Sequence, residues 1–341
     1  MTALLIALAL QAAGQPGELR TFQDWTVGCD NGRACQAVAL TSYGPESEGT
    51  MVLSLRRAAA GAAEPVIAID AHENLCDAVL VADGRRLNTR FIAARACEIV
   101  HPADVPELIA ALRGARRIEV TGATGASIGT ITLSGASAAM LYIDEAQGRL
   151  DTATALVRRG PRGADAVPPP PALPVVRAAP AYMGASISLD DDRVAAFRRQ
   201  TGCAIEEVGG PDEYSTYPLE PGKTLLLLAC GAGAYNFSSV PLIVRDRDGR
   251  IVAEVAAFDS AAGFRDEEGP AALVNAEWDG PDGLLTEYPR GRGLGDCGSR
   301  SSYVWDGSRF RLVLREEMGE CRGAYDFIRT WRARVERPDA P

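Results

Sequence analysis

The chain has 341 residues, enough for about two domains that each bury a hydrophobic core. Hydrophobic residues make up 47% of it and charged residues 23%, which excludes a wholly disordered chain, and the 35 glycines and 21 prolines favour a fold rich in turns and strands. The 45 acidic and 35 basic residues give a net charge of −10, which argues against a general nucleic-acid-binding protein, because neutralising phosphates needs a basic surface.

Residues 1–14 have the pattern of a secretory signal peptide. Residues 4–10 form an apolar run, and the small residues Ala12 and Gly14 follow it. The run is too short to span a membrane, and no later stretch reaches the roughly 18 apolar residues of a transmembrane helix. We therefore expect an exported, periplasmic protein that is not membrane-spanning.

Eight cysteines divide evenly between the two halves of the chain. Disulfides persist in an oxidising compartment, so we expect two of them in each half. Four cysteines allow three connectivities, and the sequence alone does not choose among them. We expect neighbours along the chain to pair, with local support for the first pair from the turn residues 30–33. The expected pairs are Cys29 with Cys35, Cys76 with Cys97, Cys203 with Cys230, and Cys297 with Cys321.

A proline-rich stretch separates the two halves. Residues 161–186 include four consecutive prolines at positions 168–171, which favour the polyproline II conformation and cannot join a sheet ladder. We therefore expect one domain over residues 15–160, a semi-rigid linker over 161–186, and a second domain over 187–341.

The first half has the pattern of an antiparallel β-sandwich. Short runs that are alternating or continuously apolar are bounded by turn residues, as in β-strands. One helix is expected between them, beginning after Asp104 and ending at Gly114. The expected strands are 25–29, 35–40, 51–55, 66–69, 78–81, 117–121 and 128–133.

The second half begins with a helix and continues with strands. Ser188 or Asp190 caps the helix, and Gly202 ends it. The fold class is therefore mainly β, with two β-rich domains, the first an antiparallel β-sandwich, and a few short helices. The expected strands of the second half are 225–230, 240–245, 251–258, 301–305, 310–314 and 331–335.

Five sequence motifs stand out near the two ends of the chain. They are FQDWTVGCDNGRAC at 22–35, YPRGRGLGDCGS at 288–299, YVWDG at 303–307, CRG at 321–323 and TWRA at 330–333. With these motifs the chain resembles the proteobacterial family called domain of unknown function 1176. The first half is also similar to the invasion associated locus B proteins, which are small exported β-sandwich proteins. The resemblance implies an envelope location, a disulfide framework and a β-rich first domain, and it supplies no catalytic residues.

The arginine- and glycine-rich stretch around Arg292 is the most concentrated candidate site. Three alternating glycines surround this arginine, and Arg290 and Arg300 are close by in sequence. Guanidinium groups and backbone N–H groups of such a loop can bind a carboxylate or a phosphate. In the alternative, the arginines pair internally with acids such as Glu287 or Asp296, and the glycines only permit positive φ.

The two histidines suggest a metal site, for which there is a simpler alternative. His72 precedes Cys76 by four residues, and His101 follows Cys97 by four, which is a set of groups that can bind Zn²⁺. In the alternative, the two cysteines form a disulfide and the histidines lie on flanking loops. Export and the unusual spacing favour the disulfide, so we expect no metal and no cofactor.

Function is less well determined by the sequence than location and fold. With only two histidines, a Ser–His–Asp or Cys–His centre has little support. We expect a non-enzymatic binding or envelope-associated protein that recognises an anionic partner, such as anionic lipid or a peptidoglycan component. Two alternatives remain open, namely a hydrolase of envelope glycans or peptides that uses carboxylates, and a secreted factor that interacts with a host.

Overall fold

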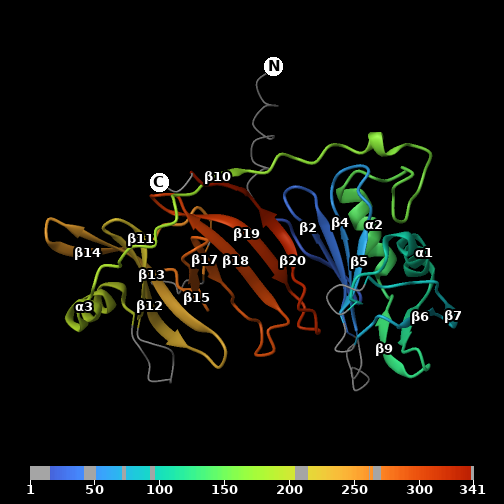
Figure 1. Cartoon of the computed structure of the whole chain (residues 1–341), viewed down its shortest axis with the longest axis horizontal. Helices are drawn as coiled ribbons and strands as arrows, with labels where there is room; N and C mark the ends of the chain where they lie inside the picture. The colour runs from blue at the N-terminus through green and yellow to red at the C-terminus, as the bar shows by residue number, and fades with distance from the viewer. Residues whose placement is uncertain are drawn as a thin grey trace, which may run out of the picture. The chain divides into compact units, whose positions relative to one another are not determined.

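The computed structural model describes residues 16–41, 51–70, 74–92, 97–203, 214–260, 262–263 and 270–338. The expected signal peptide and His72 lie outside these ranges. The chain is mainly β with short helices, as expected (Figure 1). It divides into two compact units. Unit 1 is Met1–Leu173 with Glu316–Trp331, and unit 2 is Pro174–Arg315 with Arg332–Pro341.

Two antiparallel sheets form the β-structure of unit 1. The first runs in chain order through β1 (Arg20–Phe22), β2 (Trp25–Cys29), β3 (Cys35–Ala39), β4 (Val52–Arg57) and β5 (Val66–Asp70). The second has the order β7-β6-β8-β9, with β6 (Val79–Ala82), β7 (Arg85–Arg86), β8 (Arg117–Thr121) and β9 (Ser127–Thr132). Side chains from both sheets belong to one buried core, as expected for a sandwich.

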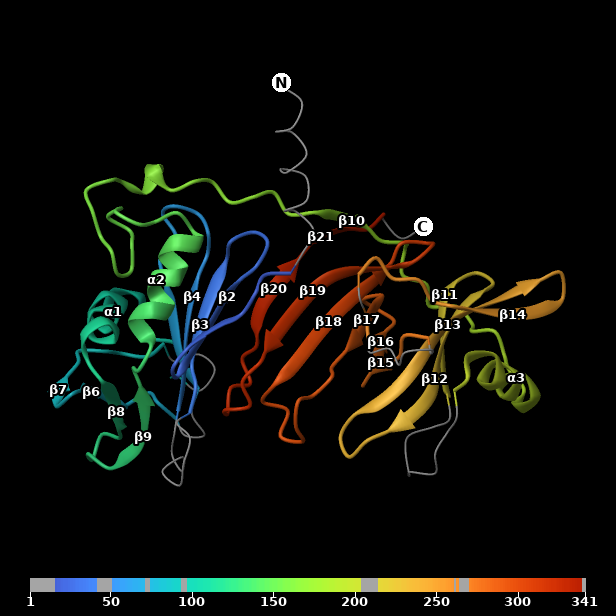
Figure 2. The same cartoon turned by 180° about the vertical axis from the view of Figure 1, so that it is seen from behind.

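Helices α1 (Val105–Gly114) and α2 (Ala136–Ala146) complete the core of unit 1 and lie beside its strands (Figures 1 and 2). Helix α1 occupies the predicted residues, whereas α2 was not predicted. Gly135 precedes α2 with φ of 99°, and a Cβ at this position would lie 1.8 Å from the carbonyl oxygen of Phe22. Only glycine fits this entry to the helix.

The C-terminal segment 316–331 belongs to the same compact unit as the N-terminal half of the chain. Arg322 is buried, and its Nη2 atom lies 2.5 Å from Oδ1 of Asp24. The side-chain amide of Gln36 donates a hydrogen bond of 2.8 Å to the carboxylate of Asp326. Unit 1 is therefore built from two stretches that are far apart in the sequence.

Unit 2 contains a meandering antiparallel sheet with the order β11-β12-β13-β14, and β15 pairs with β13. Helix α3 (Asp191–Thr201) has the two predicted capping residues. The side chain of Asp190 caps its first turn by accepting a hydrogen bond from the Arg193 amide, and Gly202, with φ of 66°, follows its last residue. The strands of this sheet are β11 (Tyr214–Glu220), β12 (Lys223–Ala232), β13 (Phe237–Arg247), β14 (Arg250–Val255) and β15 (Leu273–Val274).

Most of the remaining strands come later in the chain than this sheet, and only β10 comes before α3. Strand β10 (Val175–Arg177) lies within the expected linker and pairs in parallel with β21 (Arg334–Glu336). Strands β16 (Glu277–Asp279), β17 (Leu284–Glu287) and β18 (Gly298–Trp305) pair antiparallel in that order. The division between the two units passes through β19 (Phe310–Met318) and β20 (Ile328–Arg332).

All eight cysteines are disulfide-bonded. The bonds Cys29–Cys35, Cys76–Cys97 and Cys203–Cys230 join the expected partners, and Cys297 and Cys321 are bonded too. The second of these bonds removes both thiolates from the zinc alternative, because a disulfide sulfur is not the anionic ligand that zinc needs. His101 instead caps a short 3-10 helix, where its Nδ1 atom accepts a hydrogen bond of 3.3 Å from the Ala103 amide.

Candidate functional site

The three predicted site arginines lie on or beside the connection between β17 and β18 in unit 2. We call residues 288–300 the arginine loop. Gly298 has φ of 130°, and a Cβ there would lie 2.1 Å from the carbonyl oxygen of Pro289. Residues 290 and 298 form a β-bridge at the base of the loop. The close approach of its two arms therefore requires glycine at position 298.

Arg292 is held by an acid of the same loop. Its Nε and Nη2 atoms lie 2.7 and 2.5 Å from the two carboxylate oxygens of Asp296, which is completely buried. Such a two-point contact fixes both the charge and the orientation of the guanidinium group. For Arg292 the geometry corresponds to the internal pairing that the sequence analysis gave as the alternative.

Arg290 and Arg300 are brought together by the ring of Tyr288. Their Cζ atoms lie 5.1 and 4.6 Å from its centroid, within the range of cation–π attraction. The Tyr288 hydroxyl donates a hydrogen bond to the Gly295 carbonyl and lies 3.4 Å from Nη2 of Arg300. Two of the three predicted arginines therefore share one aromatic platform.

Two asparagines from other elements hold the backbone of the arginine loop. The side chain of Asn236 bonds both the carbonyl oxygen and the amide of Arg290, at 2.9 and 3.0 Å. Asn275 donates to the Tyr288 carbonyl at 2.8 Å and to the side chain of Asn236 at 3.0 Å. Sequence reasoning missed both residues, because no spacing relates them to the loop.

Glu287 has partners other than those that the sequence analysis considered. It is buried, and it accepts hydrogen bonds from the hydroxyl of Tyr303 at 2.7 Å and from the amide of Gly263 at 3.1 Å. Burial, and after it the charge of Glu287, raises the pKa of the Tyr303 hydroxyl. This pair lies at the start of the arginine loop and is a structural contact between β17 and β18.

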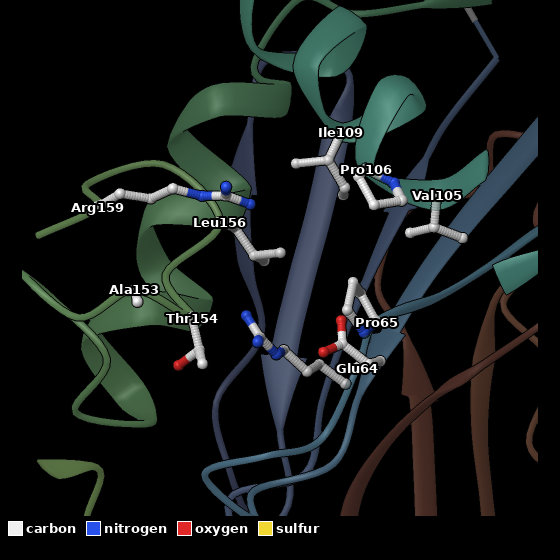
Figure 3. Close-up of a pocket in the computed structure, with 10 residues that line it drawn as sticks. Glu64, Pro65, Val105, Pro106, Ile109, Ala153, Thr154, Leu156 and Arg159 are labelled. Atoms are coloured by element: carbon white, nitrogen blue, oxygen red, sulfur yellow. The ribbon is translucent and has the colours of Figure 1, made fainter. Parts of the chain in front are cut away.

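A cavity of about 140 Å³ lies in unit 1 (Figure 3). Its walls come from the end of β4, the chain that leads into β5, the first turn of α1, and the segment after α2. No local sequence pattern marks this cavity, because its walls come from four separate stretches of chain. The lining residues are Arg57, Glu64, Pro65, Val105, Pro106, Ile109, Ala153, Thr154, Leu156 and Arg159.

Arg57 is the most deeply buried charged residue of this lining, with 3% of its surface exposed. Its Nε and Nη2 atoms each lie 3.2 Å from the Ala63 carbonyl, and its Nη1 atom is buried with no hydrogen-bond partner among the described residues. Burial, and then the charge of Arg149, lowers the pKa of Arg57 to about 10. The group is still a cation at neutral pH.

Comparison with known proteins places the chain in a family. Residues 19–334 match the family described as "Protein of unknown function (DUF1176)". The chain belongs to the DUF1176 family. This DUF1176 chain is 29% identical over 308 residues to the uncharacterized protein YpfG of Escherichia coli strain K12, which covers 86% of each protein.

A solved structure is also similar to part of this DUF1176 chain. It is the invasion associated protein B from Bartonella henselae, which matches 38% of this chain and 99% of its own length. The sequence identity is 16% and the TM-score is 0.29.

Two motifs that carry the resemblance to DUF1176 proteins meet in unit 1. Asp24 lies in the motif at 22–35 and Arg322 in the motif at 321–323, and these two residues form the ion pair described above. The disulfides of this DUF1176 chain fit an exported protein. Among the described residues, no helix is both long and apolar enough to cross a membrane.

Proposed function

We propose that this DUF1176 protein is a non-enzymatic binding protein of the periplasm that recognises an anionic component of the cell envelope. The observation that carries the proposal is the pairing of Arg290 and Arg300 on the ring of Tyr288. The disulfide framework supports the location, because such bonds persist outside the reducing cytosol.

The arrangement of charge favours an anionic ligand. Arg290 and Arg300 each lie about 5 Å from one ring centroid, so their charges lie within about 10 Å of each other and repel. A carboxylate or phosphate that contacts both groups relieves this repulsion. The protein as a whole carries a net charge of −10, so the two arginines are a local region of opposite sign that attracts an anion.

The backbone around these arginines is fixed before any ligand arrives. Asn236 and Asn275 bond the main chain at positions 288 and 290, and Arg292 is tied to Asp296. A fixed loop loses little conformational entropy on binding, which favours recognition. The role of Arg292 in the proposal is therefore to hold the loop, while Arg290 and Arg300 contact the ligand.

Binding by the double variant Arg290→Gln/Arg300→Gln tests the proposal. Wild-type protein is expected to bind vesicles that contain anionic phospholipid, or muropeptides, more tightly at low than at high salt. Each partly exposed contact contributes up to about 1 kcal/mol, so the double variant should bind about tenfold more weakly. Arg250→Gln removes an exposed charge from the β13–β14 hairpin of the same unit and is the matched control, which should bind like wild type.

The same experiment separates the alternatives. Unchanged binding by the double variant, or a large fall in its thermal unfolding midpoint, would show that these two arginines are structural. Turnover of muropeptides during the assay would instead support the hydrolase alternative.

A further inference from the structure

We propose that the cavity of unit 1 is a second binding site, which takes a small carboxylate that bears a short apolar group. This site lies in a different unit from the arginine loop and shares no residue with it. The inference therefore does not rest on the function proposed above.

Arg57 is a buried cation with one hydrogen-bond donor that is not used. This residue is almost completely buried, its Nη1 atom has no hydrogen-bond partner among the described residues, and it lines the cavity. A buried cation needs a counter-charge and acceptors for its donors. An anion in the cavity, which Arg57 lines, supplies further counter-charge to its guanidinium group.

Two neighbouring acids, Asp144 and Glu64, attract the charge of Arg57, but among the described residues neither accepts a hydrogen bond from it. Both carboxylate oxygens of Asp144 accept main-chain hydrogen bonds, from Leu156 at 2.7 Å and from Val157 at 2.8 Å. Glu64 lines the cavity and acts on Arg57 through its charge, without a hydrogen bond between their side chains in the described part of the chain. Asp144 is therefore already engaged, and Glu64 is a nearby charge without a direct contact to Arg57.

A second cation, Arg159, also lines the cavity. Figure 3 shows the side chains of Arg159 and Glu64 extending into the space between α1 and the segment after α2. The Nε atom of Arg159 donates a hydrogen bond of 3.0 Å to the Ala155 carbonyl, which orients the guanidinium group. With Arg57 and Arg159 against Glu64, the lining has an excess of one positive charge.

Arg149 fixes the wall behind these groups. It is completely buried, and it donates hydrogen bonds to the carbonyl oxygens of Ala60 at 2.6 Å and Gly61 at 2.8 Å and to the hydroxyl of Thr154 at 3.0 Å. Its donors are thus used within the protein, while its charge adds to the positive potential around Arg57. The polar side of the cavity is rigid and suited to an anion.

Size and lining identify the kind of anion. Val105, Ile109 and Leu156 are buried apolar residues that line the cavity, so part of the ligand must be apolar. A cavity of about 150 Å³ holds a ligand of the size of benzene, and this cavity measures about 140 Å³. A branched carboxylate such as 3-methylbutanoate has a similar size and both required parts.

Titration of the full-length protein with 3-methylbutanoate tests the site, and 3-methylbutanamide is the neutral probe of the same shape. Isothermal calorimetry should detect saturable binding of the acid and at least tenfold weaker binding of the amide. Arg159→Gln should weaken binding of the acid severalfold, because it removes an exposed cation from the lining. Glu64→Gln should strengthen binding, because it removes a like charge.

Two further variants keep the test independent of folding and of the arginine loop. Arg158→Gln is the matched control, because the neighbouring Arg158 pairs with Asp151 and does not line the cavity. It should bind the acid like wild type, and so should Arg290→Gln/Arg300→Gln. Equal binding of acid and amide, no saturable binding of the acid, or affinities that do not change in Arg159→Gln and Glu64→Gln would each overturn the proposal.

Discussion

Because of the contact between Arg90 and Asp104, we expect the free energy of unfolding of unit 1 to fall as the pH is lowered into the acid range. The Asp104 side chain is 7% exposed, and its carboxylate accepts hydrogen bonds from Nε and Nη2 of Arg90 at 2.8 and 2.9 Å. These bonds lower the pKa of Asp104 below its ordinary value of 3.8. A carboxyl whose pKa is lower in the folded state stabilises that state above its ordinary pKa, and loses this effect as the pH falls through the lowered value.

Asp104→Asn should therefore have a lower urea midpoint than wild type at neutral pH. The difference should shrink as the pH is lowered from about 4 downwards, because wild-type Asp104 then becomes protonated too. Asp77→Asn changes an exposed aspartate of the same unit and is the control. A difference in midpoint that is the same at all pH values would contradict the role assigned to the ionised carboxylate.

The residues of the arginine loop show how far sequence reasoning reaches at this scale. The composition of the loop identified Arg290, Arg292 and Arg300 as a group, but it did not separate the arginine that pairs with Asp296 from the two that flank Tyr288. Such a choice depends on side-chain burial, which the alternating glycines do not encode. In the same way, the Nη1 atom of Arg57 is unpaired because of tertiary burial, and no local pattern marks it.

At the scale of elements, those with a clear period or cap were predicted well. The strands at 25–29 and 117–121 and the helix that ends at Gly114 occupy the predicted residues. Strands β1, β7 and β10 have two or three residues, too few to show an alternation.

Helix α2 is the instructive omission among the elements. Its buried residues Ala136, Ala139, Met140 and Ile143 have the spacing of one helix face, so the signal is present in the sequence. The usual start signal is absent, because the residue before the helix is glycine in a left-handed conformation and caps no amide with a side chain.

The segment 316–331 should stabilise unit 1 chiefly through Arg322. This residue is 5% exposed, and it bonds the Asp24 carboxylate and, at 2.7 Å, the Thr41 carbonyl. Arg322→Ala leaves these acceptors without their donor and should lower the free energy of unfolding of unit 1 by about 2 to 3 kcal/mol.

Urea denaturation followed by the fluorescence of Trp25, which is completely buried in unit 1, measures this loss. Variants in which the other tryptophans are replaced by phenylalanine isolate the signal. Arg329→Ala removes a more exposed arginine of the same segment, whose Nη2 atom lies 3.8 Å from Glu316, and should change stability by less than about 1 kcal/mol. Equal effects of the two substitutions would show that Arg322 has no special structural role.

At the scale of the whole molecule, the first half of the chain has no disulfide to the second half, but it shares a compact unit with part of it. The four cysteines before the proline-rich stretch pair with one another, so no disulfide joins them to the rest of the chain. Yet residues 316–331 belong to unit 1. Cleavage between the halves should therefore leave two fragments that stay associated until they are denatured.

A protease site introduced beside Met183, which is 69% exposed, tests this prediction. The two fragments should elute together in native gel filtration and separate in a denaturing gel without reductant. The intact protein should have no titratable thiol after denaturation, because all eight cysteines are bonded. Fragments that separate under native conditions would contradict the assignment of residues 316–331 to unit 1, and fragments that migrate together in the denaturing gel would contradict the disulfide pairs.

Unit 1 contains residues from both ends of the chain, so it can be completed only near the end of synthesis. Asp24 leaves the ribosome 298 residues before Arg322, its partner. Residues 174–315, most of unit 2, are therefore made while unit 1 still lacks a segment, although it was begun first. Premature termination near the 3′ end of the coding sequence would for this reason leave unit 1 incomplete. During synthesis, the N-terminal part of the chain would also need protection by chaperones for longer than the rest.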